Sequence, residues 1–409
     1  MNRSAVALAV CAAFAAPAAF ADVTISGAIN MGIEYLNVGD ASSNYGGNRD
    51  GQSNFGISNN YSNVTISSTD DLGGGLKLDF AFQIQTANDT AGGNLTNRNS
   101  HIGLVSESWG GVWYGSNENI YERYFYSIDP IDAAAGLGGN LQMMGNPGGQ
   151  AFCNAANRTT QGNAGDGCYS WYRRDSDSIW YDSPNFNGFT FGAVWMTDDN
   201  RPAKTAGVDV NPQGWEVGAK YVGPTLPLQA WLAYGERNDE FGLESFVANG
   251  RTGQFSVTAT DGSKDTALHG GVGYTVGDIF LFVDAERLEY KLDGVATGDI
   301  KKWTRNAYSV GTKWNLATGY VGAQYILASD ASCDLEGGGG CADNDTGGQM
   351  IGLGYYHNLS KQTQAYVVAS WIDNKDNANY GTAGISNGAN FTNLGSTIYG
   401  LGVGLKHSF

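Results

Sequence analysis

Residues 76–85 read Leu-Lys-Leu-Asp-Phe-Ala-Phe-Gln-Ile-Gln, in which apolar residues alternate with polar or small ones. Side chains of a β-strand point alternately to opposite faces, so Leu76 and Phe80 share one face and Lys77 and Asp79 share the other. About ten residues with one apolar face is the length of a tilted strand that crosses an outer membrane. This stretch therefore predicts a transmembrane β-strand.

The same alternation recurs along the chain. The expected strands lie near residues 23–35, 54–69, 76–85, 98–107, 111–117, 176–184, 188–197, 214–222, 227–236, 265–275, 278–290, 304–315, 318–328, 348–358, 362–373 and 399–409. There are sixteen of these segments, and bacterial single-chain barrels have an even number of strands. The predicted fold is all-β, a 16-stranded antiparallel transmembrane barrel.

The connections between these segments alternate between short and long. Short turns are expected at residues 72–75, 109–111, 185–188, 222–227, 276–277, 317–319 and 358–361, and long polar loops at about 37–53, 86–97, 118–173, 198–213, 237–264, 291–303, 329–347 and 374–396. Short periplasmic turns and long external loops are typical of membrane barrels. A soluble β-sandwich also shows alternating strands, but it does not need this regular pattern of connections.

Composition excludes other classes. Mean hydropathy is −0.28, and no apolar run reaches the roughly 20 residues that a membrane-spanning helix needs. Recurrent aromatic and β-branched residues argue against disorder. The formal net charge of −17 disfavours nucleic acid as a partner.

Residues 1–21 have the features of a cleaved signal peptide. Arg3 supplies a positive start, an apolar core of about ten residues follows, and Ala19-Phe20-Ala21 fits a cleavage site. The expected mature barrel domain is residues 22–409, with a net charge of −18 because Arg3 is removed.

Several strings resemble the trimeric general porins of the neisserial and β-proteobacterial type. The strings are DVTISGAINMGIEYL (residues 22–36), DDLGGGLKLDFAFQIQ (70–85), NRNSHIGLV (97–105), DSDSIWYDSPNFNGFTFGAVW (175–195), NLSKQTQAYVV (358–368) and GLGVGLKHSF (400–409). They occur in the family's order over nearly the whole mature chain. Two positions depart from many relatives, which carry arginines where this chain has Ser116 and Trp180.

The resemblance implies an outer-membrane homotrimer with one water-filled pore per subunit for small hydrophilic solutes and ions. It also implies that the long third loop, about residues 118–173, folds inward as the constriction. Phe409 resembles the signal that the barrel-assembly machinery recognises. Outer-membrane lipid and lipopolysaccharide are the expected surroundings, and no cofactor is expected.

Strand parity assigns the pore-facing charges. The expected wall contains Glu34, Lys77, Asp79, Arg174, Asp182, Glu216, Lys220, Asp284, Glu286, Lys313 and Lys406, with Trp180 among them. The third loop offers Glu118, Glu122, Asp129 and Asp132 as constriction acids, or as ordinary solvated loop charges. Most of the acidic excess lies in the external loops, and an acidic mouth predicts a weak cation preference.

The four cysteines of the mature chain allow three connectivities. The expected pairing is local, Cys153–Cys168 and Cys333–Cys341, because each pair falls within one loop. No zinc-type spacing accompanies them. The acids Asp334, Glu336, Asp343 and Asp345 are a weak calcium candidate, since a calcium loop with the required ligand spacing is missing.

Two other readings of the sequence stay open. Trp113, Trp180, Trp231, Tyr356 and Tyr366 form either a stacking track for sugars or aromatic compounds, or ordinary wall and girdle residues. An enzyme is disfavoured because no serine or aspartate stands beside any of the four histidines in a recognisable constellation. A purely adhesive barrel would need a plug to close the channel, and no separate plug domain is visible.

Overall fold

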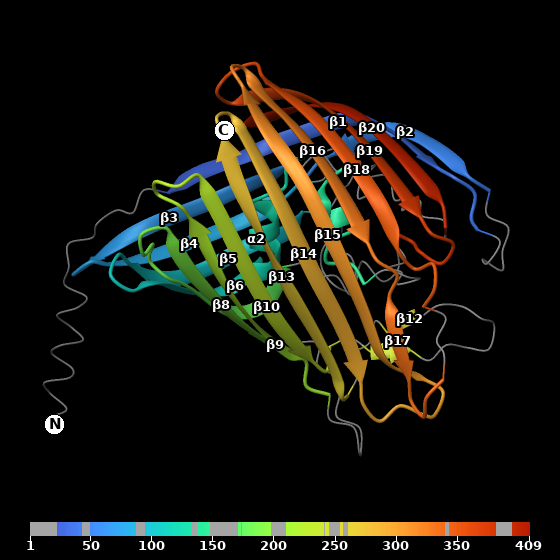
Figure 1. The fold of residues 1–409 in the computed structure, drawn as a ribbon. Helices are drawn as coiled ribbons and strands as arrows, with labels where there is room; N and C mark the ends of the chain where they lie inside the picture. The colour runs from blue at the N-terminus through green and yellow to red at the C-terminus, as the bar shows by residue number, and fades with distance from the viewer. Residues whose placement is uncertain are drawn as a thin grey trace, which may run out of the picture.

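The computed structural model describes residues 23–42, 50–86, 95–131, 137–147, 171–172, 174–197, 210–240, 242–244, 254–256, 261–339, 343–381 and 395–409. Its strands form a closed antiparallel barrel (Figure 1). The barrel strands are β1 (Thr24–Val38), β2 (Gln52–Asn59), β3 (Asn63–Gly73), β4 (Leu76–Gln85), β5 (Thr96–Ser106), β6 (Gly110–Glu118), β7 (Arg174–Asp182), β8 (Phe189–Thr197), β9 (Gln213–Val222), β10 (Leu228–Asn238), β13 (Ser263–Val276), β14 (Ile279–Leu292), β15 (Ile300–Leu316), β16 (Gly319–Ala328), β17 (Ser332–Leu335), β18 (Gly348–Asn358), β19 (Thr363–Asn374) and β20 (Thr397–Ser408).

The predicted sixteen strands are confirmed, although the closed sheet contains eighteen strand segments. β2 and β3 both pair with β1, so they are two parts of one barrel strand. That strand is interrupted at residues 60–62, where Tyr61 takes a positive φ of 60°. β16 and β17 both pair with β15 and form a second divided strand. The short pair β11 (Gly242–Glu244) and β12 (Gln254–Ser256) makes a separate sheet.

Pairing between the first and last strands closes the barrel. Ala28 through Val38 of β1 face Ser408 through Ile398 of β20 in continuous register. The seam ends on two backbone hydrogen bonds between Gly27 and Phe409, of 3.1 and 3.0 Å. Closure leaves the barrel sheet without a free edge, which is required where lipid offers no hydrogen-bond partners.

Exposure follows the predicted alternation. On β1, Ile29 is 50 % exposed and its near neighbour Glu34 is 1 % exposed, because they point to opposite faces of the wall. Leu281 and Leu405 are likewise about half exposed on the outer face. None of the helices in the described part of the chain is long and apolar enough to cross a membrane.

Both ends of the barrel have the expected connections. Short turns join β3 to β4 and β13 to β14, where Gly73, Gly74, Gly75 and Gly277 adopt positive φ angles that favour glycine. The described parts of the long connections, such as residues 293–299, follow the opposite ends of the strands. Residues 1–22 lie outside the described residues, so the signal peptide stays a prediction.

Candidate pore and its constriction loop

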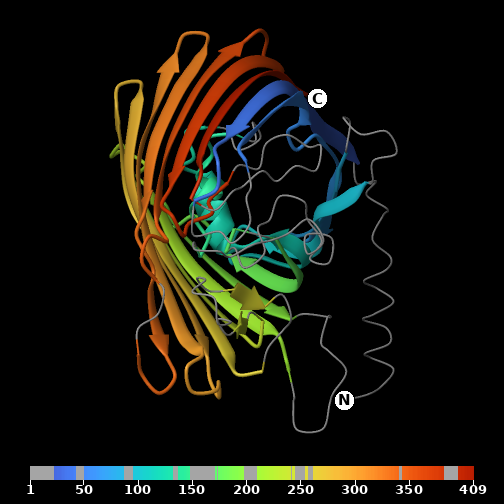
Figure 2. The same cartoon turned by 90° about the vertical axis from the view of Figure 1, so that its right-hand side faces the viewer.

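The described parts of the third loop lie inside the barrel. After β6, helix α2 (Ile120–Tyr126) begins at Asn119, whose side chain accepts a hydrogen bond of 2.7 Å from the backbone N of Glu122. Figure 2 shows α2 within the ring of strands. The predicted inward fold of the third loop is confirmed, and its role as the constriction stays a prediction.

Glycines on the inner wall let α2 approach closely. A Cβ built on Gly218 of β9 would lie 2.5 Å from Cγ2 of Ile120 and 2.7 Å from Cε2 of Tyr124. Gly192 of β8 faces the same isoleucine, which is completely buried. Burial raises the pKa of Tyr124 to about 12, so its phenol stays neutral at physiological pH.

The rest of the loop follows a similar track along the wall. A Cβ on Gly322 of β16 would collide with the carbonyl oxygen of Pro130, and one on Gly352 of β18 would collide with that of Gly138. Leu137 packs over Gly400 and Gly402 of β20. The loop therefore crosses from β8 to β20 against one side of the barrel.

A buried ion pair holds the middle of the loop. Glu286 of β14 pairs with Arg305 of β15, and both side chains are fully buried. Glu286 accepts hydrogen bonds from the Tyr121 hydroxyl and, at 2.8 Å, from the Gly145 backbone N. Arg305 donates to the carbonyl oxygens of Met143, at 2.8 Å, and Asn146. Charged partners in a dry site make such contacts strong.

Asp129 forms a second set of contacts that hold the third loop against the wall. Its carboxylate accepts hydrogen bonds of 3.0 Å from the backbone N atoms of Ile131 and Asn140 and one of 3.2 Å from Gln324 of β16. This residue was predicted as a constriction acid. The structure places it in the loop's own turn and against the wall.

A third group of charges lies where the loop leaves and rejoins the barrel. Arg174 of β7 pairs with Glu118 at 2.6 Å and lies 3.8 Å from Glu122. Arg98 of β5 lies 4.0 Å from Glu118. Glu118 is 21 % exposed and Glu122 is fully buried, so Glu122 does not have the exposure expected of a constriction acid. Asp132 lies outside the described residues.

Arg237 of β10 is the centre of a fourth group. Its guanidinium lies 3.4 Å from Asp175, 3.3 Å from Glu216 and 3.6 Å from Glu240, and it stacks on the Trp171 ring at 4.3 Å. Glu216 also accepts a hydrogen bond of 3.1 Å from the Tyr121 backbone N. The returning end of the loop is thus tied to the same wall as α2.

The wall beside α2 carries half-buried polar groups. Asp79 of β4 accepts a hydrogen bond of 2.9 Å from Trp113 Nε1 and lies 3.2 Å from His101 Nε2. Asp182 of β7 pairs with Arg123 of α2 at 2.7 Å. The exposed fractions of the Asp79, Asp182 and Arg123 side chains are 29 %, 36 % and 24 %.

The predicted pore-wall residues divide into two sets. Lys77, Asp79, Asp182, Lys220, Lys313 and Lys406 face the interior and keep exposed surface. Glu34, Trp180, Glu216, Asp284 and Glu286 also point inward but are buried, as is Arg174. They were expected to line the pore, and contacts with the wall or the third loop cover them instead.

The predicted aromatic track is not a continuous exposed surface. Trp113 and Trp180 stack on each other with ring centroids 6.1 Å apart. Trp231 is buried and donates a hydrogen bond of 2.7 Å to Asp284. Tyr356 is buried and stacks on Tyr320 at 4.4 Å, while the hydroxyl of Tyr366 donates to Asn30 at 2.9 Å. These rings pack the wall.

Sequence reasoning missed four inward arginines. Strict alternation back from Ile102 turns Arg98 toward lipid, but a bulge between the Phe82 and Ile84 pairs turns it inward to hydrogen-bond with Gln83 and Gln85. Arg237 lies just beyond the expected end of its strand. Arg305 has inward parity and was overlooked, and Arg123 lies on a loop helix that alternation cannot place.

The structure describes only some of the residues that the loop predictions concern. Cys153, Cys168 and Cys341 lie outside the described residues, so the pairings Cys153–Cys168 and Cys333–Cys341 stay predictions. Asp334, Glu336, Asp343 and Asp345 are described, and no three potential metal ligands gather within the described chain. Glu336 lies 3.7 Å from Lys301, and Asp343 accepts from the Cys333 backbone N at 3.2 Å. The weak calcium candidate therefore gains no support.

A closed membrane barrel with a loop packed inside defines the class of outer-membrane channels, and comparison with known proteins agrees. A family model described as Gram-negative porin matches residues 7–377. The chain belongs to this family and is an outer-membrane protein.

Individual relatives cover the whole chain or nearly all of it. It is 29 % identical over its whole length to the whole of outer membrane porin protein 32 of Delftia acidovorans. It superposes on the anion-selective porin from Comamonas acidovorans with a TM-score of 0.66 at 23 % identity, covering 95 % of this chain and all of that one. OmpT of Vibrio cholerae in its trimer form gives 0.57 at 12 % identity, covering 95 % and 99 %.

Proposed function

We propose that this chain forms a water-filled channel for passive diffusion of small hydrophilic solutes and ions across the outer membrane. The observation that carries the proposal is the third loop. Buried ion pairs fasten it to one side of a closed barrel, while Asp79, Asp182 and Arg123 keep solvent-exposed surface on the interior. Sixteen strands enclose enough space for an aqueous channel.

The proposed selectivity is a weak cation preference set by the external mouth. The acids that approach the third loop are largely paired with arginines, so the wall carries opposed charges. Described rim acids such as Asp334, Asp343 and Asp345 stand on the external connections. Acidic mouths concentrate cations. The Comamonas porin is anion-selective; that likeness, at 23 % identity, concerns the fold and lends the cation preference no support.

Planar-bilayer recording in a salt gradient tests both parts of the proposal. We expect ohmic single-channel current and a reversal potential of cation-selective sign that shrinks between 0.1 M and 1 M salt. The Debye length falls from about 10 Å to about 3 Å over that range, so the field of the mouth is screened. The variant Asp334→Asn/Asp343→Asn/Asp345→Asn should lower the preference, while Asp278→Asn, in a periplasmic turn, should not.

Absence of current from folded protein would exclude the channel. A clear anion preference at low salt would exclude the proposed sign of selectivity and leave the channel intact.

We further propose a homotrimer, supported by the resemblance of the sequence to trimeric porins and by the trimer form of Vibrio OmpT. The molecular mass of the folded protein in mild detergent, before and after heating, tests it.

A further inference from the structure

One outward-facing patch is basic although the chain as a whole is acidic. Among the described residues, Lys264 of β13, Arg287 and Lys291 of β14 and Lys302 of β15 lie together on the outer face. Their side chains are 47 %, 51 %, 44 % and 31 % exposed. We call these four residues the basic patch.

The register of the sheet places the three lysines of the basic patch in one row. Lys264 stands directly opposite Lys291, and Lys291 directly opposite Lys302. Like charges in directly opposed positions destabilise a sheet. The row therefore needs anions to offset its repulsion.

Among the described residues, two carboxylates form ion pairs with the basic patch. Glu289 lies 2.6 Å from Lys291, 3.2 Å from Lys302 and 3.6 Å from Arg287. Glu236 of β10 lies 2.8 Å from Lys264. Both are 16 % exposed, so they lie beneath the more exposed cations. These described groups, four cations and two carboxylates, carry an excess of two positive charges.

The position of the basic patch along the barrel axis indicates which level of the membrane it faces. β13 and β14 are joined by the short turn at Gly277, and the basic patch lies at their other end, which belongs to the external side. Arg287 stands opposite Leu268, which pairs with Tyr234 of β10, and the exposed Tyr308 and Val310 follow toward the turn. Tyrosines flanking an apolar belt mark the level of the lipid headgroups.

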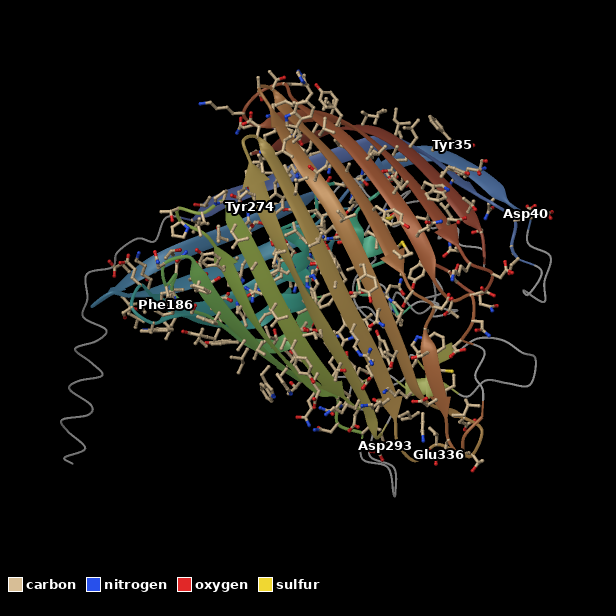
Figure 3. All side chains as sticks on the ribbon, in the orientation of Figure 1. Tyr35, Asp40, Phe186, Tyr274, Asp293 and Glu336 are labelled. Carbon is tan, nitrogen blue, oxygen red and sulfur yellow. The ribbon has the colours of Figure 1, made fainter. Side chains whose placement is uncertain are left out.

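The figures show the same placement. β14 and β15 run on past the ends of neighbouring strands (Figure 1), and Asp293 and Glu336 mark that far end while Tyr274 lies at the opposite end (Figure 3). Lys291 is two residues before Asp293.

We propose that the basic patch binds the phosphate groups of a phosphorylated glycolipid in the outer leaflet of the membrane. The lysine row spans three strands, about 10 Å at the usual strand spacing. Ammonium and guanidinium groups at the headgroup level attract anionic lipid, and each contributes to binding. The occupant is thus a membrane lipid held beside the pore, and its binding does not depend on which solute passes.

The test uses the full-length folded protein and vesicles of phosphatidylcholine that contain bis-phosphorylated lipid A. We expect the variant K264Q/K291Q/K302Q to bind these vesicles at least about tenfold more weakly than the unaltered chain, because each lysine adds to the attraction. The control K301Q/K361Q/K375Q removes three exposed lysines elsewhere and should bind like the unaltered chain.

Three results would overturn the proposal: equal binding by both variants, equal binding to dephosphorylated lipid A, or complete competition by millimolar inorganic phosphate. If the triple variant does not fold, the comparison of phosphorylated and dephosphorylated lipid A on the unaltered chain decides. Channel current is recorded on the same samples, so loss of lipid binding with intact current separates this proposal from the proposed channel.

Discussion

At the scale of single residues, the charges inside this barrel act in pairs that fix the third loop. Glu286 and Arg305 are both fully buried, and each also binds backbone atoms of the loop. A buried charge that loses its partner remains desolvated without compensation. The pair therefore determines where the loop lies.

The change Glu286→Gln leaves Arg305 buried without its carboxylate. We expect the free energy of unfolding to fall by about 3–5 kcal/mol and the open-channel current to become noisier as the loop loosens. Urea unfolding of the folded barrel in detergent measures the first effect. The double variant E286Q/R305Q should recover part of the loss, and a single variant as stable as the unaltered chain would contradict this role.

At the scale of elements, α2 depends on inner-wall glycines. Ile120 and Tyr124 occupy the space that a side chain at Gly218 would need. A short helix of seven residues has little stability of its own, so tertiary packing holds it.

We expect Gly218→Ala to cost about 1–3 kcal/mol through overpacking and to shift α2, which changes the single-channel conductance. The control Ala285→Leu adds a larger side chain on the lipid-facing side of β14 and should leave conductance unchanged. An unchanged conductance for Gly218→Ala would show that α2 does not shape the opening.

The elements also show what sequence alone predicts. Alternation placed all sixteen predicted strands, because lipid on one side and water or packed loop on the other enforce a period of two, but it assigned β17 to a loop. It missed the interruption at residues 60–62 and the bulge that turns Arg98 inward, since both break that period. It placed Glu286 on the inner face correctly, but only the folded loop buries it.

At the scale of the whole molecule, the barrel closes on its last residue. Phe409 exchanges two backbone hydrogen bonds with Gly27, and its ring lies against that glycine. We propose that Phe409 serves both this seam and recognition by the barrel-assembly machinery.

Deletion of Phe409 should lower the amount of folded barrel in the outer membrane severalfold, measured by heat-modifiable migration in gels. Phe409→Ala keeps the backbone pair and separates the two roles. Reduced assembly in cells with normal refolding in detergent would indicate recognition, whereas normal assembly in cells would contradict it.

The glycines beneath the third loop have a consequence for variation among related chains. The loop lies over glycines that belong to barrel strands, namely Gly192, Gly218, Gly322 and Gly352. The sequence of the strands therefore determines where the loop can pack closely against the wall. A loop of altered sequence or length can then follow the same path, provided that its fastening residues remain. Related chains can therefore differ in the composition of this loop and still keep an opening of the same size. New permeation properties can arise in this way without a change in the barrel strands.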